Sequence, residues 1–557
     1  MPYLDTFSGN WTEKEARHLL KRTSFGITQN LVNSAISLGF TNTIDKLFEE
    51  NPLQSFPLKY EFDEINSSDI IRPGNNFRTT QLNGDEINDP GANYGETWVN
   101  APAYPDSVTN QERTKIYRSR NRSLYAWSYL QMQNAGISIS EKLTLFWHNH
   151  FVSVNTNPHR EYYYMNVLRT NSLKNFKELV KKVTVDTNML LYLNGSKNTN
   201  IAPNENYARE LLELFTIGKG DAVGPGDYTN YTEDDILEIA KILTGWRVKG
   251  LNNTDALDSF FSNYFHEKGD KVLSHRFNNA VISENGEDEF KDLINIIFEQ
   301  DECSRFISRK LYRWFVGSEI TSDMEINIID PLAEIIRNND YDIVPALKTL
   351  LSSDHFFENT FCMVKSPIDL MLSVTKSLLV SAPTTSVNEE YNFAYIIYLA
   401  CTDLNQSIFH HPDVAGWKAY YQAPLFYKSW VNNYLLPKRL DYCRIIVTGG
   451  DLMIDEKEYT VPPLVPVLQI ASGITNSQDP TTLITELANQ LFNYPIEQNQ
   501  IDTLKNILIP GLPDFEWTVE YSNFLANPTD DFLRISIENK LRNLIAVMVQ
   551  MSEFQIM

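Results

Sequence analysis

The chain has 557 residues, of which 42% are hydrophobic and 12% aromatic, so it can bury a large core. Its 48 basic and 71 acidic residues give a formal net charge of −23, which argues against an extended nucleic-acid-binding surface, because such a surface needs clustered basic residues. The sequence contains no apolar run as long as a membrane span, about 18 residues, and no visible signal peptide. We therefore expect a soluble protein whose compartment the sequence leaves open.

The four cysteines are widely separated, at Cys303, Cys362, Cys401 and Cys443. Their spacing matches neither a metal-binding motif nor the dense pattern of a small disulfide-stapled scaffold. We expect them to be mostly buried thiols.

Helical periodicity dominates the chain from its first residues onward. A capping box at residues 12–15 predicts one helix start, and a second at residues 138–141 predicts another. In chain order, helices are predicted over residues 12–21, 28–37, 41–50, 109–133, 138–151, 162–170, 173–183, 187–193, 204–217, 232–244, 289–299, 303–315, 324–338, 343–352, 366–379, 392–401, 425–435, 463–472, 481–492, 501–506 and 529–551.

Two segments depart from this helical pattern. Residues 51–110 are rich in Pro, Gly, Asn and Asp, which indicates a long irregular excursion, either a lid over a site or a surface insertion without a chemical role. Residues 246–282 carry aromatic and β-branched runs that predict one or two short hairpins within a loop-rich section ending near residue 285. No repeat of fixed period is present. The sequence thus predicts a mainly α protein with residues 1–557 in one continuous domain.

The segment 142–151 is an apolar helical run that ends in His148, Asn149 and His150. Residues two apart point about 200° away from each other on a helix, so both imidazoles can reach one site only if the helix ends here. The following residues, up to Pro158, predict that it does. Neutral imidazoles bind metals and act as general bases. The alternative is one histidine bonded to a core backbone group and one at the surface.

The segment 204–218 gathers charged residues on helix faces away from its apolar stripe. Glu205, Arg209 and Glu213 follow one face, with Glu210 beside them. In a functional interpretation, Arg209 orients carboxylates, and Glu210 or Glu213 is a metal ligand or base. In the alternative, these residues form ion pairs on an ordinary exposed face. His266, in a polar turn, could complete a metal shell.

Other polar patterns favour structural roles. Asp186 is interpreted as a helix N-cap, and the segment from His410 to Asp413 as a turn packed by Trp417. The sequence contains no P-loop, dinucleotide-binding glycine motif, nucleophile elbow or His-Glu-x-x-His metalloprotease motif.

Several motifs in order resemble one bacterial family. They include His18-Leu-Leu-Lys-Arg-Thr-Ser-Phe-Gly26 and Glu141-Lys-Leu-Thr-Leu-Phe-Trp-His-Asn-His-Phe151. The others are the segments 204–218, 231–246, 309–316, 351–357 with 365–367, 412–417 and 552–555. Together they are similar to the family catalogued as domain of unknown function 1800, across nearly the whole chain.

This resemblance implies no established reaction. Members of the family are often exported and often encoded beside a companion protein of a sulfatase-like family, which makes such a protein the expected partner. Many members have His where this chain has Phe215, a His-Asp pair where it has His266-Glu267, and Asp-Pro where it has Asp186-Thr187.

Two hypotheses follow for function. In the first, the protein is an enzyme with a site between the helices 142–151 and 204–218, with hydrolysis preferred to oxidation. Its proposed catalytic residues are His148, His150, Arg209, Glu210 and Glu213, and a divalent metal would be held by His148, His150, Glu210 and His266. In the second, the protein is a non-catalytic helical scaffold or an export or assembly partner. The substrate, the metal and the oligomeric state are left open.

Overall fold

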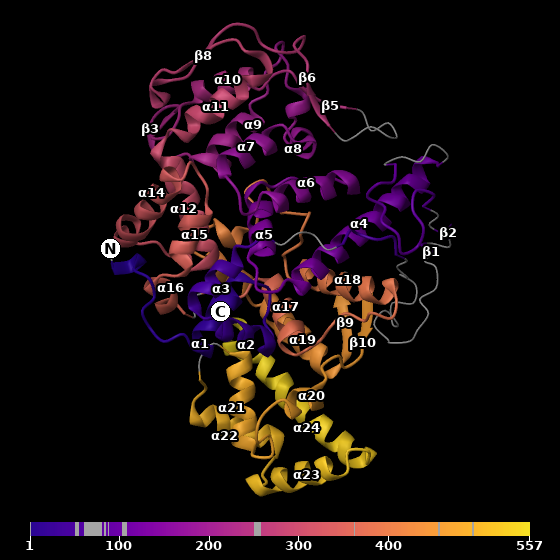
Figure 1. Ribbon diagram of the computed structural model, residues 1–557. Coiled ribbons are helices and arrows are strands. Elements are labelled where there is room, and N and C mark those ends of the chain that lie inside the picture. The colour runs from indigo at the N-terminus through magenta and orange to yellow at the C-terminus, as the bar shows by residue number, and fades with distance from the viewer. Residues whose placement is uncertain are drawn as a thin grey trace.

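The computed structural model describes residues 2–50, 55–60, 81–82, 85–86, 89–102, 108–249, 258–360, 363–454, 457–492 and 495–557. Helices dominate it, and the strands pair only as two-stranded antiparallel sheets (Figure 1). The predicted mainly α class is confirmed.

Helices of the first half are α1 (Glu13–Thr23), α2 (Gln29–Leu38), α3 (Phe40–Leu47), α4 (Asn110–Asn134), α5 (Ser140–His150), α6 (Pro158–Thr170), α7 (Phe176–Thr184), α8 (Thr187–Tyr192), α9 (Asn206–Glu210) and α10 (Glu233–Ile242). A π-helical segment, Leu211–Thr216, continues α9, and a second one, Glu325–Ile329, lies between α13 and α14.

Helices of the second half are α11 (Glu289–Phe298), α12 (Asp301–Phe315), α13 (Ser322–Met324), α14 (Asp330–Asn338), α15 (Val344–Leu351), α16 (Asp354–Glu358), α17 (Pro367–Ser377), α18 (Val387–Asp403), α19 (Leu435–Thr448), α20 (Val467–Ser472), α21 (Pro480–Leu491), α22 (Gln498–Leu508), α23 (Asp514–Ala526), α24 (Asp531–Gln550) and α25 (Ser552–Gln555). Single 3₁₀ turns occupy Pro2–Leu4, Gly195–Lys197, His275–Phe277, Gly286–Asp288, Lys418–Tyr420 and Phe426–Trp430.

The strand pairs are β1 (Gln81–Leu82) with β2 (Asp85–Glu86), β3 (Ala222–Gly224) with β4 (Asp227–Tyr228), β5 (Trp246–Val248) with β6 (Ser259–Phe261), β7 (Lys271–Val272) with β8 (Val281–Ile282), and β9 (Gly450–Ile454) with β10 (Lys457–Val461). The pairs β5–β6 and β7–β8 confirm the hairpins predicted over residues 246–282. The pair β9–β10 was not predicted, although Leu452 and Ile454 are buried and Met453 between them is exposed, which is the alternation of a half-buried strand.

The second half also holds four helices that the sequence did not predict, namely α16, α19, α23 and α25. A helix was expected over residues 425–435, but this stretch contains only the 3₁₀ turns of Phe426–Trp430, and α19 begins at Leu435. Pro437 obscures the pattern of α19, yet it lies in the first turn, where a missing backbone N–H costs little. Of the other three, α23 is the longest, with 13 residues.

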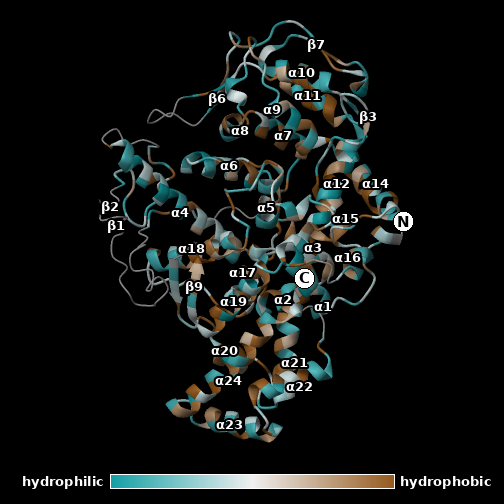
Figure 2. Ribbon diagram, turned by 180° about the vertical axis from the view of Figure 1, so that it is seen from behind, coloured by the Kyte–Doolittle hydropathy of each residue, from teal (hydrophilic) through white to brown (hydrophobic). Residues whose placement is uncertain are grey.

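The buried apolar residues form one connected cluster that extends from Ala16 to Phe554. Helix α5 lies near the middle of the main body, and all of its residues are buried (Figure 1). Helices α20 to α24 form a lobe at the bottom of the same view. Hydrophobic and hydrophilic residues are mixed along most helices, as expected of helices that bury only one face (Figure 2). None of the described helices is long and apolar enough to span a lipid bilayer.

Three of the four cysteines behave as predicted: Cys303, Cys401 and Cys443 are buried free thiols. Cys362 lies outside the described residues.

The described parts of the 51–110 excursion are anchored on the helical body. Trp98 is fully buried and donates a hydrogen bond from its ring nitrogen to Ser123 Oγ of α4, 2.9 Å away. The backbone N–H of Leu58 donates to the Tyr391 hydroxyl of α18. These contacts attach residues 55–60 and 89–102 to α4 and α18.

Candidate functional site

Helix α5 ends at His150, as the sequence predicted, and the chain turns away before α6 begins at Pro158. Asn157 caps α6 by accepting hydrogen bonds from the N–H groups of His159 and Arg160. The end of α5 is therefore surrounded by other elements, and His148, Asn149 and His150 are each at most 8% exposed.

His148 and Asn149 hold the loop of residues 409–417. The backbone N–H of Phe409 donates to His148 Nε2 over 3.0 Å, and that of Trp417 donates to Asn149 Oδ1 over 2.8 Å. Because Nε2 accepts, the proton of a neutral His148 is on Nδ1, which makes no hydrogen bond with the described residues. Burial, together with the charge of Arg169, lowers the pKa of His148 to about 3.

His150 binds a different part of the molecule. Its Nε2 lies 3.0 Å from the carbonyl oxygen of Phe215, and Lys310 Nζ donates to its Nδ1 over 3.1 Å. Burial, and then the charge of Lys310, hold the pKa of His150 well below its usual value. The two α5 histidines are thus neutral near pH 7 and point to separate partners.

The second segment of the predicted site, residues 204–218, contains α9 and its π-helical extension, and it is held by contacts to α10. Arg209 makes two hydrogen bonds to Glu233, of 3.0 and 2.8 Å, and one of 3.2 Å to Glu205. The Glu205–Arg209 ion pair expected from the sequence is therefore present. Glu213 accepts a hydrogen bond from the Tyr231 hydroxyl, while burial and the charge of Glu213 raise the pKa of Glu210.

His266 belongs to a third cluster. Its Nδ1 is 2.9 Å from the carbonyl oxygen of Thr244, and its Nε2 is 2.9 Å from Glu289 Oε1. Lys271 Nζ donates to the other oxygen of Glu289 over 2.7 Å, and the side chains of His266, Lys271 and Glu289 are all at most 1% exposed. This network ties the β7–β8 hairpin to α11.

The structure does not bring the four predicted metal ligands together, because His148, His150 and His266 face three different sets of partners. Across the described ranges, no three His, Cys, Asp or Glu side chains are grouped so that they could hold a metal ion. A divalent metal shared by His148, His150, Glu210 and His266 stays a prediction.

A cavity of about 530 Å³ is lined in part by the loop of residues 409–417 that α5 holds. It is lined by Tyr398, Thr402, Asn405, Ser407, His410, Pro412, Trp417, Lys418, Ala419, Ser429 and Trp430. Its volume is within the range of small-molecule sites, about 300–1,000 Å³, and its wall combines aromatic rings with hydroxyl, amide, imidazole and ammonium groups.

His410, on this wall, forms a hydrogen bond with a residue of helix α4. Its Nε2 lies 2.9 Å from the hydroxyl of Tyr125 on α4. Desolvation by its neighbours lowers the pKa of His410, and burial, with Tyr398 beside it, holds the pKa of Tyr125 well above 10. At neutral pH the pair is therefore a neutral imidazole and a protonated phenol.

His411 faces the opposite way, toward α5. Its ring centroid lies 4.6 Å from that of His148 and 4.3 Å from that of Trp417. The turn packed by Trp417 that the sequence predicted is thus confirmed. The cavity next to that turn was missed, and the signal available for it was the adjacent pair His410 and His411 followed by Trp417 and Trp430.

The fold and this site define a large helical protein with a histidine-bearing cavity beside a buried central helix. The chain matches the family described as "Protein of unknown function (DUF1800)" over residues 18–556, and it belongs to that family. No similar curated protein and no similar solved structure was found.

Proposed function

We propose that the protein is a hydrolase whose reaction takes place in the cavity beside the 409–417 loop, with His410 as general base. The observation that carries this proposal is the neutral imidazole of His410, held by Tyr125 at the wall of a cavity of about 530 Å³. Because the pKa of His410 is lowered, its imidazole is unprotonated at neutral pH and is available to accept a proton.

The hydrogen bond to Tyr125 assigns separate tasks to the two ring nitrogens. When Nε2–H donates to the phenol oxygen of Tyr125, Nδ1 is left as the acceptor that can take a proton from a water molecule in the cavity. The water oxygen then attacks the electrophilic centre of the substrate, and the leaving group recovers the proton from His410.

The rest of the wall suggests the substrate class. Lys418 and Asn405 offer hydrogen-bond donors, while Trp417 and Trp430 offer apolar ring surface. This combination suits a small molecule that carries both a polar, hydrolysable group and a ring or other apolar part. In this proposal the α5 residues His148 and Asn149 are positioning residues, because they act on the cavity only through the loop.

The test is turnover of a panel of chromogenic esters, phosphate esters and glycosides by wild type, His410→Gln, Tyr125→Phe and the matched control His275→Gln, which changes an exposed histidine. We expect His410→Gln to lower kcat by about 10²–10⁴-fold. Tyr125→Phe should shift the acidic limb of the pH–rate profile, and the control should behave as wild type. Full turnover by His410→Gln would contradict the proposal. So would a wild type that hydrolyses none of the three substrate classes and binds none of these small molecules.

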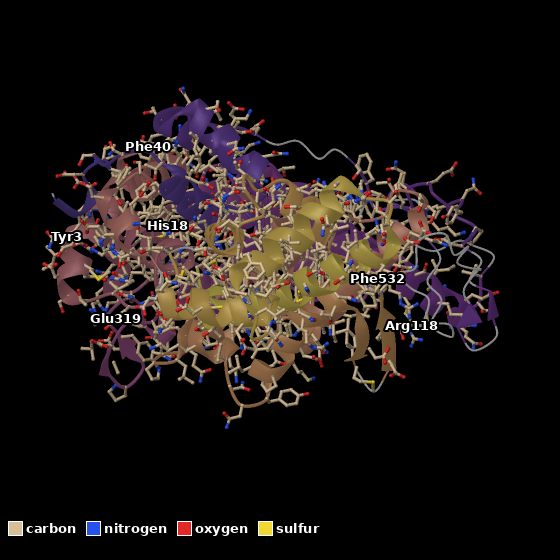
Figure 3. All side chains as sticks on the ribbon, turned by 90° about the horizontal axis from the view of Figure 1, so that it is seen from below. Tyr3, His18, Phe40, Arg118, Glu319 and Phe532 are labelled. Atoms are coloured by element: carbon tan, nitrogen blue, oxygen red, sulfur yellow. The ribbon has the colours of Figure 1, made fainter. Side chains whose placement is uncertain are left out.

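A second candidate function is assembly with another protein. Helices α23 and α24 pack on each other and leave large apolar side chains exposed: Phe515 at 60%, Val519 at 53%, Phe532 at 82% and Ile535 at 49%. Figure 3 looks onto this lobe and labels Phe532 on α24. Exposed apolar residues that gather on one lobe are typical of a protein interface.

In this candidate, the partner is the companion protein of the sulfatase-like family, and it docks on α23 and α24. Co-expression of the two proteins should give a stable complex that Phe515→Ser and Phe532→Ser weaken, while Phe260→Ser, on the exposed strand β6, should not. A complex that forms equally with all three variants would contradict docking at this lobe.

A further inference from the structure

Three polar side chains meet where the first turn of α6 packs against the start of α8. Glu161 lies in that first turn, and Asp186 caps α8 by accepting a hydrogen bond of 2.7 Å from the backbone N–H of Asn188. Glu161 Oε1 accepts from the backbone N–H of Asn155, in the segment between α5 and α6. The cluster thus joins three segments that follow α5 in the chain.

The cluster is removed from solvent but is incompletely bonded. Glu161 and Asn188 are both 0% exposed, whereas Asp186 is half-buried and keeps contact with solvent. Oε2 of Glu161 and both polar atoms of the Asn188 amide make no hydrogen bond of ordinary geometry with the described residues. Buried polar atoms are nearly always bonded, so these atoms indicate a missing partner.

Burial, helped by the charge of Asp186, keeps the pKa of Glu161 well above its usual value. The side chain of Asn188 opposes this shift, so it lies beside the carboxylate. Burial also raises the pKa of Asp186 to about 6, although backbone N–H groups and Arg160 oppose this. The cluster therefore holds two carboxyl groups against one nearby guanidinium.

We propose that Glu161, Asp186 and Asn188 form a binding site for one divalent cation, Ca²⁺ or Mg²⁺, between α6 and α8. Carboxylate and amide oxygens are the ligands that these hard cations prefer. The cation would bond to the free Oε2 of Glu161 and to Oδ1 of Asn188, and it would neutralise the charge that Arg160 leaves uncompensated. The remaining coordination positions would be filled by water, which Mg²⁺ in particular retains.

This site is separate from the proposed general base. It differs also from the histidine set that the sequence suggested, because its ligands are oxygens and only two of them come from carboxylates. The competing explanation is a proton: a neutral Glu161 could stay buried without any cation. The experiment must distinguish these two possibilities.

The test uses the full chain after treatment with chelator and dialysis. Thermal unfolding is followed while CaCl₂, MgCl₂ or NaCl is added at constant ionic strength, and bound metal is counted by mass spectrometry. We expect one divalent salt to raise the unfolding midpoint in proportion to the logarithm of its concentration, with one ion bound per chain. NaCl should have no such effect.

Two variants and a control locate the site. Glu161→Gln resembles the protonated acid, so it should fold, lose the cation-induced shift and bind no ion. Asn188→Ala removes only the amide and should weaken cation binding by about tenfold or more. Glu178→Gln, a change of a more exposed glutamate on α7, should keep the full shift.

Three results would overturn the proposal. The first is a wild type that shows no shift and no bound ion, which assigns a proton to Glu161. The second is an equal shift in wild type and Glu161→Gln, which places the ion elsewhere. The third is equal stabilisation by NaCl, which rules out selection for a divalent ion.

Discussion

Arg120 and Asp89 form a salt bridge of two hydrogen bonds, each 2.8 Å long, and their side chains are only 1% and 2% exposed. The guanidinium also lies 5.9 Å from the ring centre of Trp98. This pair fastens the described residues 89–102 to α4, the helix that also carries Tyr125. A buried salt bridge thus attaches this part of the loop-rich excursion, which the sequence predicted, to the helical body.

Asp89→Ala should destabilise the protein by about 3–5 kcal/mol, because it leaves the guanidinium of Arg120 buried without its counter-charge. The measurement is the free energy of unfolding in urea. The double variant Asp89→Leu with Arg120→Met should lose less than the single one, since it buries no unpaired charge. A double variant as unstable as the sum of the two single variants would show that the pair is not coupled.

Gly416→Ala should lower the free energy of unfolding by about 2 kcal/mol or more. Gly416 has a φ of +88°, which L-residues rarely adopt, and a Cβ there would lie 2.4 Å from Asn149 Oδ1. The clash should also displace the Trp417 N–H that donates to the same oxygen. The same change at Gly136, where a Cβ would meet no atom within 4 Å, is the control. Equal stability of both variants would contradict this account.

Stability should fall as the pH is lowered from about 6.5 toward 3, because the native state keeps His148 neutral while the unfolded chain protonates it. The unfolded state binds more protons in this window, so the free energy of unfolding decreases with decreasing pH, by up to about 1.4 kcal/mol per pH unit for one such histidine. Urea unfolding at a series of pH values measures the slope. His148→Gln should reduce it, and His275→Gln should not.

Arg209→Ala should cost only about 0.5–1 kcal/mol, because the partners of Arg209 are about 40% exposed and solvent screens their charges. Thermal or urea unfolding gives this number. The variant also separates the two functional hypotheses: under the cavity proposal it should retain turnover. A loss of turnover with unchanged stability would return Arg209 to the catalytic role that the sequence suggested.

Local signals predicted much of the helical structure. The capping box at Thr12 and Glu15 starts α1, and Thr232 caps α10, where the sequence placed them. The capping box predicted at residues 138–141 is wrong, because α5 begins at Ser140 after Ile139 and without a side-chain cap. These signals act within one helical turn, so they can be read without knowledge of the fold. They failed at α19, where Pro437 obscured the pattern, and at α23.

The candidate site was less predictable. The sequence singled out His148 and His150 as a pair, and the structure directs them to different partners. His410, interpreted from sequence as part of a structural turn, lines the cavity as well. Which residues surround a side chain depends on contacts such as that from Phe409 to His148, which are 261 residues apart.

The sequence by itself determined the mainly α class, the family, and α5 as a buried helix ending at His150, because periodicity, caps and ordered motifs are local properties. Only the tertiary structure decided that His148 holds the 409–417 loop and that His410 faces a cavity. It alone also placed the Glu161 carboxylate, whose Oε2 makes no ordinary hydrogen bond with the described residues, beside the buried amide of Asn188. The physical reason is that burial, pKa and bonding of a polar side chain are set by neighbours brought together only when the chain folds.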